Sequence, residues 1–326
     1  MFKSKTKYTW EGWESSGRED WVFSVKHPCE LIGVHAKLID AQLKESEKVE
    51  YCIYSPRVSS TSTPFGLKAA ESSSGICVTD KRFIISNSKH VKGIEPTLSS
   101  ISFEDILYFN IGSAMLLSWF SLGFIKQGEL DRVTIIFSSN GKHHFQKALR
   151  VFKKHSLAIS TDDFKLDSSS PAAFIHRIKD KIHRDYLKTL LSDHEKCILT
   201  FSCRYIWEKV LNKRSLLKRK NQVSYLTSKA TALLTNKALM IARDGIGHSI
   251  GTSVDIFNVS LDKVKGIGMF EENTDGEKIH KLRINFTKEV NSGTLDISFT
   301  DIDEETKIFL TDIPSLLNKE EKNGEL

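Results

Sequence analysis

The residues best suited to chemistry form a dense basic stretch, Trp207–Lys220, which reads WEKVLNKRSLLKRK. Several flexible ammonium and guanidinium groups on one segment can match a multiply charged phosphate. The leucines among them could insert shallowly into a bilayer interface. The alternative is a solvated loop or short helix whose leucines pack on the rest of its domain. On the first interpretation, the anion-binding residues are Lys209, Lys213, Arg214, Lys218, Arg219 and Lys220.

Other groups of residues that could support catalysis or metal binding have simpler explanations. The sequence contains no Walker A loop, no HExxH and no CxxC pair. Gly245–Gly251 has the wrong spacing for a dinucleotide loop and is interpreted as a flexible turn. His143 and His144 point about 100° apart on a helix, which is poor geometry for sharing a metal. The acidic residues at 301–305 stand where a helix should begin, and capping explains them. We therefore expect a non-catalytic protein with no cofactor and no metal site.

Two similar stretches indicate an internal repeat around the basic residues. Gly75–Ser86 reads GICVTDKRFIIS, and Thr231–Ala242 reads TALLTNKALMIA. Both run from apolar residues through T-[DN]-K to apolar residues, which predicts a strand, a tight turn and a second strand. Asp and Asn tolerate the positive φ of a hairpin turn. We therefore predict two copies of one β-rich module, with hairpins 75–88 and 231–243 in equivalent places.

The elements expected around the first hairpin are strands followed by one helix. Apolar and β-branched runs predict the strands. Helical spacing of Phe145, Leu149 and Phe152 predicts a helix over 142–155, with Lys147, Arg150, Lys153 and Lys154 outward. The expected strands are 22–25, 49–55, 107–111, 115–125 and 132–138.

The second copy repeats this order after a linker. Pro171 suits a helix start, and the spacing of apolar residues predicts one helix from there to about Leu191. Its apolar face would be Phe174, Ile178, Ile182, Tyr186 and Leu190. The expected strands are 197–203, 224–227, 281–286 and 294–300, and the closing helix is 304–317.

Three tryptophans, Trp10, Trp13 and Trp21, cluster with charged residues before the first module. We interpret them as an extension that covers a module edge, with a partner-binding aromatic patch as the alternative. A helical stripe of Leu31, Val34, His35, Leu38, Ile39 and Gln42 follows them.

Composition bounds the remaining possibilities. The 326 residues carry a formal net charge of +6, a mild excess that permits anionic partners. The five cysteines show no metal-type spacing, which favours buried thiols in a reducing compartment. The start of the sequence lacks the apolar core of a signal peptide, and the run 111–125 is shorter than the roughly 18 residues of a membrane span. We expect a soluble, cytoplasmic protein.

The repeat resembles the pleckstrin-homology (PH) superfold, and the first copy is most similar to its GRAM and bacterial PH-like branches. The fragments that carry the resemblance are GICVTDKRFIIS, ISFEDI, SAMLLSWFSLGF and HFQKALRVF, then TALLTNKALMIARD and VSLDKVKGIGMF. The resemblance implies a mainly β fold with some α: two PH-like β-barrel or sandwich modules, each closed by a C-terminal helix and joined by a helical linker. In lipid-binding PH domains the loop that corresponds to 209–220 holds phosphoinositide headgroups.

These observations together predict five segments and a binding function. The segments are a Trp-rich extension 1–45, a first module 46–156, a linker 157–194, a second module 195–318 and a tail 319–326. The leading function is peripheral association with anionic membrane lipid through 209–220. A protein-interaction scaffold is the second hypothesis. Nucleic-acid or histone-type binding through the same basic surface is the third.

Overall fold

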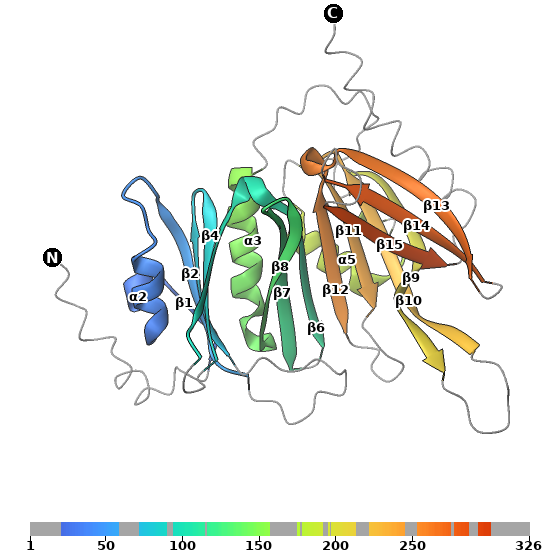
Figure 1. The fold of residues 1–326 in the computed structure, drawn as a ribbon. Helices are drawn as coiled ribbons and strands as arrows, with labels where there is room; N and C mark the ends of the chain where they lie inside the picture. Colours follow the sequence, from blue (N-terminus) through green and yellow to red (C-terminus); the bar gives the residue numbers. More distant parts are fainter. Residues whose placement is uncertain are drawn as a thin grey trace, which may run out of the picture. The chain divides into compact units, whose positions relative to one another are not determined.

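The computed structural model describes residues 21–58, 72–89, 94–114, 116–156, 175–176, 178–191, 195, 197–212, 222–244, 253–274, 277–286 and 293–300. Contacts divide the chain into two compact units: unit 1 is Met1–Phe124 with Arg132–Asp163, and unit 2 is Ile125–Asp131 with Phe164–Leu326. The prediction of a mainly β fold with few helices is confirmed (Figure 1). The described sheets are open and none closes into a barrel, so that part of the expectation is wrong.

Eight strands in two groups belong mainly to unit 1, with only the tip of the β7–β8 hairpin, Ile125–Asp131, assigned to unit 2. Five form an antiparallel sheet in the order β1-β2-β3-β4-β5, and β6, β7 and β8 are neighbours in that order. The strands are β1 (Phe23–Val25), β2 (Val49–Ser55), β3 (Ser73–Thr79), β4 (Arg82–Ser88), β5 (Thr97–Ser102), β6 (Ile106–Ala114), β7 (Leu117–Lys126) and β8 (Glu129–Ser138). The helices are α2 (Val34–Asp40) and α3 (Lys142–Ser156), with the 3-10 turns η2 (Pro28–Glu30), η3 (Phe103–Asp105) and η4 (Ser139–Gly141).

The described part of unit 2 has seven strands in the order β13-β14-β15-β9-β10-β11-β12. Their pairings are antiparallel. The strands are β9 (Cys197–Asn212), β10 (Gln222–Thr235), β11 (Ala238–Asp244), β12 (Val254–Ser260), β13 (Gly266–Thr274), β14 (Glu277–Asn285) and β15 (Thr294–Thr300). Helix α5 (Lys181–Leu190) and the turn η5 (Leu261–Lys263) complete the described elements.

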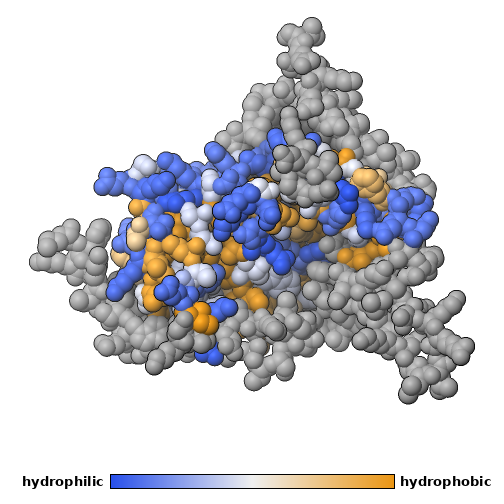
Figure 2. All heavy atoms as spheres, in the orientation of Figure 1, coloured by the Kyte–Doolittle hydropathy of each residue, from blue (hydrophilic) through white to orange (hydrophobic). Residues whose placement is uncertain are grey.

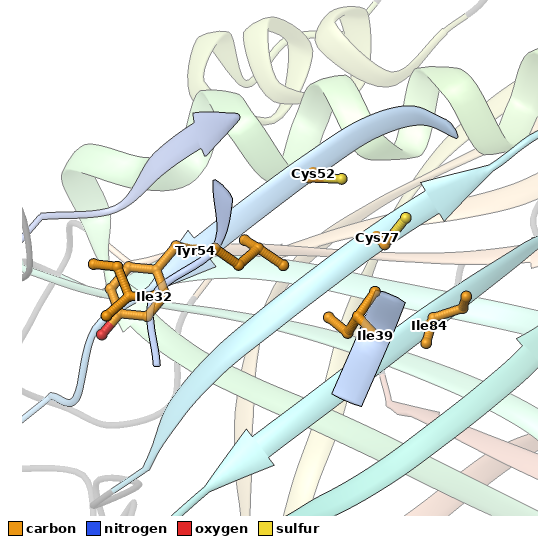
Figure 3. Packing of buried hydrophobic residues seen from close by; sticks show 7 residues of the cluster. Ile32, Ile39, Cys52, Tyr54, Cys77 and Ile84 are labelled. Atoms are coloured by element: carbon orange, nitrogen blue, oxygen red, sulfur yellow. The ribbon is translucent and has the colours of Figure 1, made fainter. Parts of the chain in front are cut away.

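The five-stranded sheet of unit 1 is covered on both faces, which is why every residue of β3 is buried. Successive side chains of a strand point to opposite faces. On β4, Ile84 joins a cluster with Ile39 of α2, while Phe83 faces Phe152 of α3 at 6.1 Å between ring centroids. Figure 3 shows part of the first cluster around the neighbouring residues Cys52 and Cys77. Helices α2 and α3 therefore supply the two halves of the core.

Helix α3 lies as the sequence predicts, with one exception. It spans one residue more than expected, and its predicted inward residues are buried. Phe145 stacks on Phe137 with 3.8 Å between ring centroids. Lys153, expected to face outward, is only 6% exposed. The aliphatic stem of a lysine can be buried while its ammonium reaches a polar partner, and helical spacing alone does not reveal this.

The prediction of one continuous linker helix is wrong, and its apolar face is confirmed at Ile178 and Leu190 but wrong at Ile182, while the predicted start at Pro171 lies outside the described residues. Residues 178–180 are not helical, and α5 begins at Lys181. Asp180 is the N-cap of α5, and its carboxylate accepts a hydrogen bond from the backbone N–H of His183 at 3.0 Å. The buried face of α5 is His183, Leu187 and Leu190, whereas the expected Ile182 is 47% exposed. The break at 178–180 changes the helical phase, so the spacing of apolar residues before the break does not predict which residues of α5 are buried. The predicted closing helix 304–317 lies outside the described residues.

The two predicted hairpins have the same turn geometry. Thr79 Oγ1 accepts from the backbone N–H groups of Lys81 (3.1 Å) and Arg82 (3.0 Å). Thr235 Oγ1 accepts from those of Lys237 (3.1 Å) and Ala238 (2.9 Å). Among the described residues outside glycine, only Gln127 has a positive φ, so the expected positive φ of the Asp or Asn is wrong. The threonine hydroxyl, rather than a left-handed residue, organises each turn.

Replacing Thr79 or Thr235 by valine should destabilise each unit by a similar amount, about 1–3 kcal/mol, because a buried hydroxyl that satisfies two N–H groups is lost at constant volume. Serine at either position keeps the hydroxyl and should cost less than half as much. Hydrogen exchange of the hairpin amides together with urea denaturation measures both effects. Equal losses for valine and serine would show that the methyl group, and not the hydrogen bonds, holds the turn.

The equivalence extends beyond the turns. In each unit, a register shift in the strand ladder lies next to the pair that contains the turn threonine. In unit 1 the shift lies between Val49 and Tyr51 of β2, and in unit 2 it lies between Leu234 and Thr235 of β10. Each four-stranded meander, β2–β5 and β9–β12, ends in a 3-10 turn. The first residue of that turn donates its N–H to the lysine carbonyl of the hairpin, Phe103 to Lys81 and Leu261 to Lys237, both at 2.9 Å. Two distant stretches of sequence thus build the same local structure.

A buried histidine docks the helix that precedes each hairpin. His35 of α2 hydrogen bonds the hydroxyls of Ser86 (3.0 Å) and Ser73 (2.8 Å). A Cβ at Gly75 would lie 2.6 Å from the Cβ of His35, so glycine makes room for the ring. In unit 2, His183 of α5 hydrogen bonds the hydroxyl of Thr231, the residue aligned with Gly75, at 2.9 Å. No pattern in the sequence predicted this pairing of helix and hairpin, because the bonded residues are far apart in the chain.

Candidate anion-binding site

The six predicted anion-binding residues divide between a strand and a segment outside the described residues. Lys209 lies on β9 and pairs with Tyr225 of β10. Lys213, Arg214, Lys218, Arg219 and Lys220 lie outside the described residues. The expected loop 209–220 is therefore wrong at its start, because the β9–β10 ladder continues to the pair Asn212 and Gln222. In the sequence, the basic residues after Asn212 follow directly from the end of this antiparallel ribbon, which has a register shift between Leu226 and Thr227.

This ribbon reaches beyond its neighbours in the sheet. The pairing of β10 with β11 ends at Ala230 and Arg243, and the pairing of β15 with β9 ends at Tyr205. Among the described strands, Ile206–Asn212 and the facing part of β10 pair only with each other. At about 3.3 Å per residue the two-stranded part spans roughly 20 Å. Figure 1 shows β9 and β10 continuing past the ends of β11 and β12.

The corresponding hairpin of unit 1 has no such extension. The β2–β3 ladder begins at the equivalent pair, Val49 with Thr79, and ends at Ser55 with Ser74. The ladder of unit 2 begins at Cys197 with Thr235 and runs on to Asn212. The extension is thus a property of the second copy, which is also the copy that carries the basic stretch.

Two polar pairs lie on β11, beside the point where β10 leaves the sheet. Arg243, opposite Ala230, donates from Nε to Asp255 Oδ1 at 2.6 Å and from Nη2 to Oδ2. Both residues are buried, at 6% and 1% exposure. The next residue, Asp244, accepts a hydrogen bond from His183 at 3.0 Å.

The cysteines and the paired histidines show ordinary packing. The five thiols are free, and Cys52 lies opposite Cys77. A hydrogen bond with Cys77, and then burial, raise the pKa of the Cys52 thiol. His144 hydrogen bonds the Tyr51 hydroxyl at 2.7 Å, and burial lowers its pKa to about 4. The described residues contain no group of three His, Cys, Asp or Glu side chains that could hold a metal ion.

The segment interpreted above as a flexible turn also contains a pattern found in hydrolases. Gly247–Gly251 reads GHSIG, which matches the GxSxG of nucleophile elbows. That motif requires a strand that turns sharply into a helix. Here the preceding strand is β11, and the next described element is the antiparallel strand β12. The context on either side of Gly247–Gly251, which itself lies outside the described residues, does not fit the elbow.

The remaining sequence expectations concern the tryptophans and the membrane. Trp21 is 60% exposed, and Trp10 and Trp13 lie outside the described residues. No helix in the described part of the chain is both long and apolar enough to cross a membrane. No protein-family model matches the chain, and no curated protein is significantly similar to it.

Proposed function

We propose that this chain is a non-catalytic binding protein with two PH-like modules, which associates peripherally with anionic membrane lipid through residues 209–220. The observation that carries the proposal is the two-stranded extension of β9 and β10, at whose end the basic stretch stands. The two-stranded extension separates the basic stretch, along the chain, from the rest of the sheet. Mutual repulsion opposes such clustering in a purely structural turn, and an anionic surface removes that penalty.

The modular part of the proposal is supported by the order of elements. Each unit runs through a four-stranded meander, a 3-10 turn and three further strands, and in unit 1 helix α3 follows. This is the succession of strands and closing helix that the PH resemblance implies. The matched hydrogen bonds of Thr79 and Thr235 support a common origin of the two copies.

Reversing Lys213, Arg214, Lys218 and Arg219 to glutamate should abolish binding to vesicles that contain phosphatidylserine. The thermal stability should change little, because exposed charges stabilise folds weakly. Wild-type binding should weaken as salt rises, since charges are screened over about 8–10 Å at physiological ionic strength. Vesicle flotation at several salt concentrations measures both effects. The matched control reverses four exposed lysines of unit 1, namely Lys26, Lys37, Lys44 and Lys89.

Two results would replace this function with another. If the wild-type protein ignores anionic vesicles at low salt but binds duplex DNA with a steep salt dependence, the nucleic-acid hypothesis takes its place. If it binds neither, the scaffold hypothesis remains. Strand β5 supports the scaffold hypothesis, because among the described strands it pairs only with β4. Its other edge could therefore pair with an extended peptide as an additional strand.

A further inference from the structure

Strand β7 is flanked by two hairpin turns of different character. Between β7 and β8, Gln127 and Gly128 have positive φ values of 53° and 85°, as a two-residue type I′ turn requires. Between β6 and β7, Ala114 pairs with Leu117, so the intervening residues are Met115 and Leu116. Leu116 is not among the residues with positive φ, so its backbone does not call for Asn or Gly, and nothing in the turn requires a large apolar side chain at this position.

Hydrophobic residues reach the surface of the described part of the chain between hydrophilic ones (Figure 2). Among the large ones, Leu116 at 81% and Trp21 at 60% are the most exposed. Val22, the residue after Trp21, packs on Gly141 of η4. A Cβ atom at Gly141 would lie only 2.4 Å from the Cβ of Val22. Ser139 of η4 donates its N–H to the carbonyl oxygen of Leu116 at 2.8 Å. The turn η4 therefore links the chain around Trp21 to the β6–β7 turn.

Cations surround the same end of unit 1. Helix α3 begins directly after η4, and Lys142 Nζ donates to Ser113 Oγ, near the end of β6, at 3.3 Å. Exposed basic residues continue along one face of α3 at positions 143, 147, 150 and 154. The helix contains no Asp or Glu. The acidic residues that face it, Glu50, Glu104 and Asp105, lie toward its C-terminal half, where His155 packs on Phe103.

Helix stability does not explain the lysine at the start of α3. The N-terminus of a helix carries a partial positive charge, so Lys142 in the first turn opposes the dipole. Lys154 in the last turn is favoured by it. Lys142, next to the apolar turn, is therefore placed against the helix's own preference.

We propose that unit 1 docks on an anionic membrane through the β6–β7 turn, with Leu116 entering the interface, Trp21 at headgroup level, and Lys142, Lys147 and Arg150 over acidic headgroups. The proposal rests on the membrane association proposed above but places a second contact in unit 1. Tryptophan favours the interfacial layer, and an apolar residue with flanking lysines and arginines is typical of shallow insertion. The cations select a lipid surface with acidic headgroups over an uncharged apolar partner.

The test uses the full chain in flotation with vesicles of phosphatidylcholine alone and of phosphatidylcholine with phosphatidylserine. The variant Leu116→Asn removes the apolar side chain at a position that is 81% exposed, so folding is preserved. Its partitioning to phosphatidylserine vesicles should fall about tenfold or more, because a large apolar side chain no longer leaves water. The control Ile94→Asn, at an equally apolar residue that is 48% exposed in unit 1, should float like the wild type.

The outcomes separate this proposal from the function it rests on. If the turn variant floats like the wild type while the reversal of Lys213, Arg214, Lys218 and Arg219 does not, the turn proposal is overturned and the ribbon site stands. If the turn variant alone loses binding, the turn proposal stands and the ribbon site fails. If the wild type floats equally with phosphatidylcholine alone or with neither vesicle, the turn proposal is overturned. It is likewise overturned if light scattering shows a dimer that the turn variant dissociates, since Leu116 then contacts a second copy.

Discussion

Replacing Asp255 by alanine is expected to destabilise unit 2 by about 3–5 kcal/mol, because the guanidinium of Arg243 is then left buried without its carboxylate. The two side chains face each other across β11 and β12 and are joined by two parallel hydrogen bonds. Taking an unpaired charge out of water is far more costly than losing one ordinary contact. The effect should appear in urea denaturation and as faster hydrogen exchange of the β11 and β12 amides.

The chain offers a matched control for this prediction. Arg283 and Asp296 make the same two-hydrogen-bond contact across β14 and β15, at 2.8 Å for both bonds, but their side chains are 41% and 36% exposed. Asp296→Ala should therefore cost at most about 1 kcal/mol, since water replaces the lost partner. The double variant Arg243→Met/Asp255→Leu should recover most of the loss, because no charge is left buried. Equal costs at Asp255 and Asp296 would show that burial does not set the strength of the pair.

Replacing either docking histidine by leucine is expected to destabilise its own unit by about 2–4 kcal/mol, since each change removes two hydrogen bonds from a buried site at similar volume. His35 and His183 are 2% and 1% exposed. His35 loses its bonds to Ser73 and Ser86, and His183 loses those to Thr231 and Asp244. Hydrogen exchange should show the opening of β3 and β4 in the first variant and of β10 and β11 in the second.

Each histidine has an exposed neighbour that serves as its control. Val34 precedes His35 in α2 and is 44% exposed, and Ile182 precedes His183 in α5 and is 47% exposed. Alanine at either neighbour should change the stability by no more than about 0.5 kcal/mol, as is usual for surface positions. If Val34→Ala and His35→Leu cost the same, the helix and not the histidine contacts would carry the docking of α2.

The two hairpins and helix α3 could be predicted from the sequence. The T-[DN]-K turns predicted both hairpins, because a short apolar run, a polar turn and another apolar run specify a hairpin through neighbouring residues. The spacing of Phe145, Leu149 and Phe152 predicted α3 to within one residue, since an amphipathic helix carries its period in its own segment. Strand β13 was missed, because Gly266 and Gly268 interrupt the apolar pattern that marks strands.

The features that hold the elements together depend on contacts between residues far apart in the chain. His35 bonds a serine 51 residues away, and His183 bonds an aspartate 61 residues away. The start of α5 depends on the Asp180 cap, and the ribbon that presents the basic stretch depends on where β11 and β15 stop pairing. Sequence periodicity reports what a segment prefers by itself. Which polar groups meet in the core, and which strand outreaches its neighbours, is decided only when burial makes unpaired polar groups costly.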